Sequence, residues 1–139
     1  MEGEAYPYLG GKVEEVMTAD PLVVLEDESL GRLVEVFAKS KFHGLPVVNS
    51  KYELVGVVRD TDLMSIFARK EPVGVRFKTV KDVMQKPPYV IVPGETIQKA
   101  IMKMFADGTR FLVVVDKERC IVGVVTSIDL VRGIRWRRD

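Results

Sequence analysis

The chain has little of several residue types on which other protein classes depend. Its 139 residues include one cysteine and one histidine, and the formal net charge is only +1. A single cysteine excludes an internal disulfide and a cysteine-based metal cluster, and a lone histidine excludes a multi-histidine metal site. A net charge this small argues against a dominating polyelectrolyte partner. The lone thiol fits a reducing cytoplasm, where we expect the protein to reside.

Long apolar runs are also missing. No stretch approaches the roughly 18 residues that a membrane span needs, so we expect no membrane association. The opening MEGEAYPYLGG lacks the basic and then apolar regions of a signal peptide, and its glycines and acids predict a loose arm over residues 1–12. With 47% hydrophobic residues, the chain suffices for one domain or two small halves that share a core.

An internal repeat organises the sequence. Val13 falls on Val80, an offset of 67 residues, and at that offset the chain matches itself without a gap. The best-preserved stretch is GVVRDTDL at residues 56–63, which becomes GVVTSIDL at residues 123–130. A fixed-period match of this kind predicts two copies of one structural unit.

Both copies predict the same order of elements. A short helical turn (13–17; 80–84) leads into a strand (22–25; 89–92). An amphipathic helix follows, with apolar residues at i, i+3, i+4, i+7 and i+8 from Leu30 and from Ile97, and with Ser29 and Thr96 as N-caps. Two strands joined by a hairpin (45–48 and 54–58; 112–115 and 121–125) precede a final helix that starts near Thr61 and near Ser127.

This order predicts an α+β fold of two β-α-β-β-α repeats. One repeat is too small to bury both faces of its sheet, so we expect the repeats to pack sheet against sheet with pseudo-twofold symmetry, with the helices outside and a cleft on each side of the axis. The predicted boundaries are an N-terminal arm (1–12), repeat 1 (13–68), a linker (69–79), repeat 2 (80–134) and a basic tail (135–139).

The motif at residues 123–130 suits a nucleotide. It reads as a strand, a tight turn and a helix start, where free N–H groups and the helix dipole favour phosphate. Thr126 and Ser127 add hydroxyl donors, and Asp129 can accept two hydrogen bonds from a ribose diol. The alternative is plain helix capping, with Thr126 or Ser127 as the N-cap and Asp129 favouring the dipole.

The first copy of the motif differs at the hydroxyl. Arg59 replaces Thr126 and Asp60 replaces Ser127, while Asp62 keeps the position of Asp129. Arg59 either clamps a phosphate as a bidentate donor or pairs with a neighbouring aspartate and fills the cleft. We therefore expect the main site at Asp129 and a doubtful second site at Asp62.

The duplicated motif, together with VMTADP (16–21), HGLPVVN (43–49) and RFLVVVD (110–116), resembles the CBS domain, and the likeness covers residues 13 to 134. It implies a tandem pair that binds an adenine nucleotide (AMP, ADP or ATP) between its repeats, forms a homodimer and regulates a separate effector protein. For the main cleft it implies base contacts from one group of residues and phosphate contacts from His43 and Arg110. The base group is Ala19, Pro21, Leu22, Phe42 and Leu45.

The resemblance also implies a set of residues for the second cleft, around Asp62 and Arg59. His43 and Arg110, which are repeat mates, have plainer alternatives as a histidine bonded to backbone and as a solvated charge. Met64, Ile66, Phe67, Met102 and Met104 are candidates for an apolar dimer interface, although core residues follow the same pattern. The remaining second-cleft residues are Lys86, Pro88, Tyr89 and Thr109.

The favoured function is a non-enzymatic sensor of AMP or ADP with no covalent cofactor, because the chain lacks a convincing nucleophile and base. Two other functions stay open. The C-terminal VRGIRWRRD sets Arg132, Arg135, Arg137 and Arg138 around Trp136, a combination typical of nucleic-acid binding, or else it is the solvated end of the last helix. The chain would alternatively serve as a purely structural dimerisation module with empty clefts.

Overall fold

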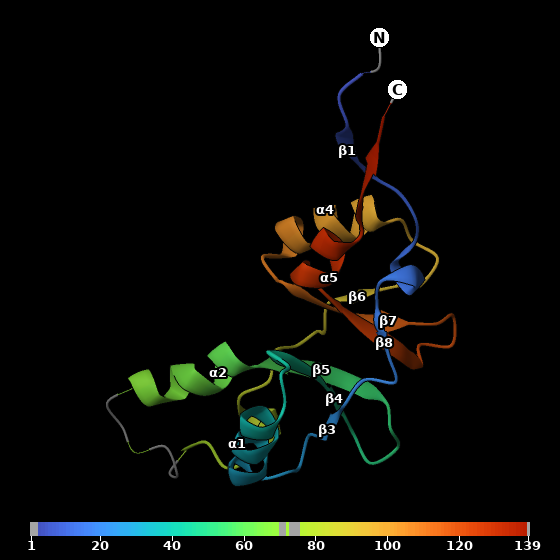
Figure 1. Cartoon of the computed structure of the whole chain (residues 1–139). Coiled ribbons are helices and arrows are strands. Elements are labelled where there is room, and N and C mark those ends of the chain that lie inside the picture. The colour runs from blue at the N-terminus through green and yellow to red at the C-terminus, as the bar shows by residue number, and fades with distance from the viewer. Residues whose placement is uncertain (1–2, 70–71, 73–75, 139) are drawn as a thin grey trace. The chain divides into compact units, whose positions relative to one another are not determined.

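The computed structural model describes residues 3–69, 72 and 76–138 (Figure 1). The chain has a mixed α+β fold, as predicted. It divides into two compact units, which are described separately: the middle unit, residues 21–88, and the terminal unit, residues 1–20 with 89–139. The predicted linker at 69–79 lies partly outside the described residues, and the sheet-against-sheet arrangement of the repeats stays a prediction.

The middle unit holds a three-stranded sheet in the order β3-β4-β5. β3 runs parallel to β4, and β4 pairs antiparallel with β5. Two short 3₁₀ turns, Ile66–Ala68 and Val80–Asp82, complete the unit. Its helices and strands are β3 (Val24–Leu25), α1 (Leu30–Lys39), β4 (Gly44–Val48), β5 (Leu54–Arg59) and α2 (Asp60–Ser65).

The terminal unit repeats this plan and extends it. A four-stranded sheet has the order β2-β8-β7-β6, and β1 and β9 form a separate two-stranded ribbon. A 3₁₀ turn at Val13–Glu15 precedes β2. The elements are β1 (Tyr6–Leu9), β2 (Thr18–Ala19), β6 (Val90–Ile91), α4 (Ile97–Asp107), β7 (Phe111–Val115), β8 (Ile121–Thr126), α5 (Ser127–Arg132) and β9 (Ile134–Arg137).

The two long helices start where the sequence predicts. Ser29 Oγ accepts a hydrogen bond from the Arg32 amide at 3.1 Å, and Thr96 Oγ1 accepts one from the Lys99 amide at 3.1 Å. Each cap satisfies a backbone donor that the first helical turn leaves without a partner. The apolar stripe faces the core in part: Leu33 in α1 and Ile97 in α4 are buried, while Val34 and Phe105 are exposed.

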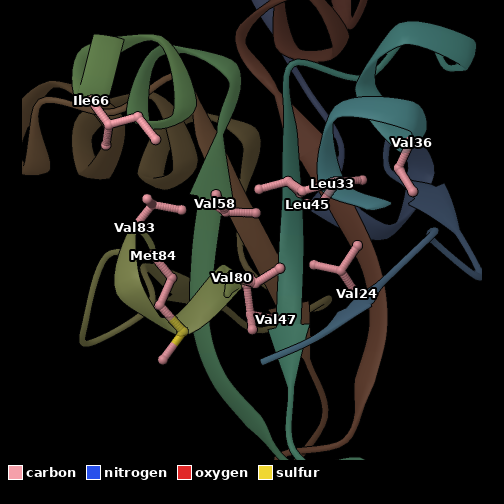
Figure 2. Packing of buried hydrophobic residues seen from close by; sticks show 10 residues of the cluster. All are labelled: Val24, Leu33, Val36, Leu45, Val47, Val58, Ile66, Val80, Val83 and Met84. Carbon is pink, nitrogen blue, oxygen red and sulfur yellow. The ribbon is translucent and has the colours of Figure 1, made fainter. Parts of the chain in front are cut away.

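The core of the middle unit draws on both sequence repeats (Figure 2). Val24, Leu33, Val36, Leu45, Val47, Val58 and Ile66 come from repeat 1, while Val80, Val83 and Met84 come from the leading segment of repeat 2. The Val80 amide also donates to the Glu28 carbonyl at 2.9 Å. The leading segment of repeat 2 thus completes the unit built by the body of repeat 1.

In the terminal unit, the leading segment of repeat 1 packs against the body of repeat 2. Val13, from the leading segment of repeat 1, is fully buried and belongs to the core with Ile91, Ile97 and Leu112. Its amide donates to the Glu95 carbonyl at 2.9 Å, which matches the bond between Val80 and Glu28. Each leading segment therefore folds with the body of the other repeat.

The chain ends differ from the prediction. Residues 1–12 are not simply a loose arm, and the C-terminal arginines are not the end of the last helix, because β1 pairs antiparallel with β9 from Tyr6↔Arg137 to Leu9↔Ile134. α5 ends at Arg132, before Gly133. Ile134 and Trp136 alternate with arginines, and this period-2 pattern of β-branched and aromatic residues favours a strand once a partner strand is available.

Candidate functional site

Each copy of the motif begins with a glycine that lets another segment approach closely. β2 pairs with β8 through Ala19↔Gly123, and a Cβ at Gly123 would lie 2.8 Å from the Thr18 carbonyl oxygen. A Cβ at Gly56 would lie 2.8 Å from the Gln85 carbonyl oxygen. Such contacts are too short for any side chain, so both copies need glycine here.

The second copy forms a reciprocal cap at the start of α5. Asp129 Oδ2 accepts hydrogen bonds from the Thr126 amide at 2.8 Å and from the Thr126 hydroxyl at 2.9 Å. The Asp129 amide in turn donates to Thr126 Oγ1 at 3.4 Å. The capping alternative is therefore what the structure shows for Thr126, whose hydroxyl hydrogen is engaged by the carboxylate and is not presented to a phosphate.

Asp129 nevertheless keeps binding capacity. Its side chain is half-buried, and within the described part of the chain Oδ1 accepts no hydrogen bond. A carboxylate oxygen has two lone pairs, so Oδ1 is available to one or two hydroxyl donors. The position combines partial burial with an unused acceptor, which is the requirement for recognising a ribose diol.

Two other predicted residues of the terminal unit contact the same motif through its backbone. Ala19 lies in β2 beside β8, and the Ser127 amide donates to the Arg110 carbonyl at 3.0 Å. Arg110 is exposed and takes part in no ion pair among the described residues. The terminal unit thus places Arg110 next to Ser127 near the capped helix start, while Ala19 lies opposite Gly123 at the beginning of the motif.

A cavity of about 350 Å³ also lies in the terminal unit, between α4 and α5. Thr109, Arg110 and Ser127 line it beside apolar side chains, but Asp129 and Ala19 do not. Thr109 is buried, and its hydroxyl donates to the Phe111 carbonyl at 3.1 Å, so it serves the local backbone. The cavity is mostly apolar and does not include the carboxylate.

The first copy uses its aspartate differently. Asp62 is only 7% exposed, and Oδ2 accepts from the Arg59 amide at 2.8 Å and from Arg59 Nε at 3.1 Å. Oδ1 accepts from Arg59 Nη2 at 2.9 Å and from Gln85 Nε2 at 3.1 Å. Both carboxylate oxygens are therefore occupied by side chains of the middle unit.

Of the two alternatives for Arg59, the structure shows the ion pair with Asp62. Gln85 completes that arrangement, and sequence reasoning missed it. The signal that could have found it is the repeat register, in which Gln85 takes the place of Thr18. Threonine is too short to reach across the strand pair in the way that glutamine does.

The predicted base and phosphate residues of the middle unit are placed as follows. His43 is highly exposed, and its Nδ1 lies 2.8 Å from Asp60 Oδ2, so its partner is a carboxylate rather than backbone. Leu45 is buried in the core and Phe42 packs against it, which leaves the Leu45 side chain unavailable to a base. Leu22 and Lys86 are exposed, whereas Pro21 and Pro88 are half-buried.

Three further predictions concern apolar side chains. Tyr89 packs against the core of the terminal unit, which explains its bulk without a ligand. Ile66 and Met104 are buried at 3% and 6% exposure, so of the two alternatives for them, interface or core, the structure shows the core. Met64, Phe67 and Met102 are exposed.

The described residues contain neither a metal-binding cluster nor a membrane-spanning helix. Over residues 3–69, 72 and 76–138, no group of three or more His, Cys, Asp or Glu side chains is placed to hold a metal ion. In the same part of the chain, no helix has the length and apolar character needed to cross a membrane.

Comparison with known proteins assigns the duplicated unit to a family. The model of the CBS domain matches this chain twice, over residues 13–69 and 80–135. The chain belongs to the CBS domain family. The two matches account for both copies of the β-α-β-β-α order, and they confirm the resemblance seen in the sequence.

Solved CBS structures share the fold. CBSX2, crystallised in complex with AMP, is 29% identical with a TM-score of 0.79 over 89% of this chain and 96% of its own. The CBS domain pair of protein MJ0100, in complex with 5′-methylthioadenosine and S-adenosyl-L-methionine, is 24% identical with a TM-score of 0.79 over 88% of this chain and 94% of its own. At that lower identity the second match supports the fold alone.

Curated relatives include enzymes that are much longer than this chain. Inosine-5′-monophosphate dehydrogenase of Methanocaldococcus jannaschii is 29% identical over 127 residues, which are 90% of this chain. Homoserine O-acetyltransferase of Methanohalobium evestigatum is 31% identical over 122 residues, which are 88% of this chain. The match spans 24% of the length of each enzyme.

Proposed function

We propose that this CBS pair is a non-enzymatic regulatory module that binds one adenine nucleotide per chain, with Asp129 accepting hydrogen bonds from the ribose hydroxyls. The observation that carries the proposal is the free Oδ1 of Asp129, set against the fully occupied carboxylate of Asp62. Two copies of the motif share one backbone design, but only one copy keeps an acceptor for a ligand.

The complex of CBSX2 with AMP supports this ligand class, because that structure combines a TM-score of 0.79 with 29% identity. The charges near Asp129 favour a short phosphate chain. Arg110 is the cation of the terminal unit that lies beside the motif, and His43 of the middle unit already pairs with Asp60. AMP or ADP needs fewer cations than ATP, so these two are the preferred ligands.

The adenine side of the site remains a prediction. Ala19 belongs to the terminal unit, while Pro21, Leu22, Phe42 and His43 belong to the middle unit. Their part in binding follows from the family resemblance. The Leu45 side chain is excluded from that role by its burial, which leaves only its backbone.

The test is a cycle that combines a protein variant with a ligand analogue. Calorimetric titration compares AMP with 2′-deoxy-AMP on the wild type and on Asp129→Ala. A hydrogen bond to a charged acceptor contributes about 1.5–3 kcal/mol, so the wild type should prefer AMP by roughly tenfold or more. The variant should bind both ligands weakly and equally, and Asp116→Ala, in the β7–β8 hairpin, is the control that leaves the preference intact.

Each part of the proposal fails in its own way. If the wild type binds no adenine nucleotide, the module is structural and the proposed function is wrong. If Asp129→Ala keeps the preference for AMP, the ligand is correct but its ribose is held elsewhere. Parallel titrations with ADP, ATP and S-adenosyl-L-methionine compare their affinities with that of AMP, which shows the preferred length of the phosphate chain and the preferred class of ligand.

Regulation requires a partner that responds to the bound state. Ligand shifts an equilibrium only through different affinities for two conformations, and we expect a homodimer and a separate effector protein to read that shift. The exposed Met64, Phe67 and Met102 are the candidate dimer contacts. Sedimentation of Met102→Glu should give a monomer if Met102 lies at that contact, while an unchanged dimer would place the contact elsewhere.

A further inference from the structure

The ribbon of β1 and β9 presents aromatic and basic side chains on one face. Directly opposed residues of an antiparallel pair share a face, so Tyr6 with Arg137 and Tyr8 with Arg135 lie together. The guanidinium of Arg137 lies over the ring of Tyr8, 4.2 Å from its centroid. Figure 1 shows the two strands side by side, next to both ends of the chain.

This part of the molecule is strongly cationic although the whole chain is not. Residues 132–138 contain Arg132, Arg135, Arg137 and Arg138 and no acid. Arg135 pairs with Glu15 at 3.3 Å, but the described residues provide no carboxylate partner for the other three. Among the described residues, the positive charge of these three arginines is therefore not balanced by an ion pair.

We propose that the β1–β9 ribbon is a binding site for single-stranded nucleic acid, a function beyond the nucleotide sensing proposed above. Arginines neutralise phosphates, and aromatic rings and guanidinium planes stack on unpaired bases without regard to sequence. The stacked pair of Arg137 and Tyr8 offers a flat surface beside those cations. A duplex hides its base faces and would use only the charges.

The size of the ribbon limits the site. Four residues per strand at about 3.3 Å each give roughly 13 Å, which is enough for about two to four nucleotides at the 3.4 Å spacing of stacked bases. We expect contacts to two or three phosphates and therefore a slope of log K against log salt of about −1.4 to −2.1. Affinity should be in the weak range of about 10⁻⁶ to 10⁻⁴ M.

The experiment measures fluorescence anisotropy of labelled dodecamers of uridylate and thymidylate, and of a 12-base-pair DNA duplex, between 50 and 200 mM NaCl. The variants are Arg137→Gln, which removes one cation, and Tyr8→Leu, which removes the ring. Lys117→Gln, in the exposed β7–β8 hairpin, is the matched control because it removes the same charge from the same unit. Circular dichroism melting checks that all three variants stay folded.

We expect the wild type to bind the single strands more tightly than the duplex. Arg137→Gln should weaken binding and reduce the salt slope by about 0.7. Tyr8→Leu should weaken binding by about tenfold, from the loss of a stacked base, without changing the slope. Lys117→Gln should change neither, and saturating AMP should not displace the dodecamer.

Several results would overturn the proposal. They are equal binding of duplex and single strand, an effect of Lys117→Gln as large as that of Arg137→Gln, and the absence of any binding. Vesicles of phosphatidylserine and phosphatidylcholine serve as a competing probe. If they bind while the oligonucleotides do not, the cationic ribbon recognises an anionic lipid surface instead.

Discussion

Asp62 and Asp129 stand at the same position of two copies of one motif, and the structure uses them differently. Asp62 is buried and gives both oxygens to Arg59 and Gln85. Asp129 is half-buried and gives one oxygen to Thr126. The backbone design is the same in both, since a glycine accommodates a neighbouring segment and the aspartate accepts a hydrogen bond from the N-cap amide of the following helix.

The difference shows how duplicated units diverge in ligand binding without changing fold. Two side chains account for it, because Arg59 replaces Thr126 and Gln85 replaces Thr18. The longer side chains satisfy the Asp62 carboxylate from within the protein, so that copy has become a structural ion pair. The shorter ones leave Asp129 with an acceptor that only a ligand or water can use.

The largest expected effect is a difference in stability between the alanine variants of Asp62 and Asp129. Asp62→Ala removes the carboxylate that Arg59 and Gln85 share and the acceptor of the Arg59 amide, and the loss of the charge-assisted bonds together with the cap costs about 3 kcal/mol of unfolding free energy. Asp129→Ala loses a helix cap, at a cost of about 1 kcal/mol. Urea denaturation of both variants measures the difference, and equal losses would contradict the distinction between them.

Substitution of Gly56 and of Gly123 should cost the same unfolding free energy, because the two copies of the motif are equivalent at this position. Gly56→Ala and Gly123→Ala each force a Cβ to within 2.8 Å of a backbone carbonyl oxygen, so each should lose about 2 kcal/mol of unfolding free energy. Gly94→Ala meets no atom within 4 Å and serves as the control. Thermal melting of all three tests this, and a tolerated Gly56→Ala would show that the segment at Gln85 is free to move.

The smallest expected effect comes from exchanging the side chains that differ. Arg59→Thr with Gln85→Thr should free Oδ1 of Asp62 and raise the number of AMP molecules bound per chain from one to two. Thr126→Arg should occupy Asp129 and weaken the existing site by about tenfold, or roughly 1.4 kcal/mol. Calorimetric stoichiometry measures both, and a folded double variant that still binds one AMP would mean that the second copy lacks more than an acceptor.

Much of the fold could be predicted from the sequence because its signals are local. The helices from Leu30 and Ile97, their caps at Ser29 and Thr96 and both hairpins depend on residues close together in the chain, and all were confirmed. The family likeness came from motifs that repeat in one register. The α+β character followed from these elements.

The parts that failed depend on contacts distant in sequence. Nothing near Trp136 indicates that its strand partner is Tyr6 to Leu9, more than a hundred residues earlier, so the sequence did not predict β9. Burial of Leu45, Ile66 and Met104 depends on which segment covers them. Gln85 was missed because its role appears only when β5 and the segment after Val80 lie side by side, as the bridge Val57↔Gln85 shows.

The exchange of leading segments also sets the order in which the two units can fold during translation. The middle unit can assemble once residue 88 has emerged, but residues 1–20 must wait for residues 89–139, which complete the terminal unit. At 5–20 residues per second, the 51 residues from 89 to 139 take about 3 to 10 s to synthesise. During that interval Val13 lacks the core residues that bury it and β2 lacks its partner β8, so this segment folds after the middle unit although it is made before it, and it is the segment that a chaperone would meet.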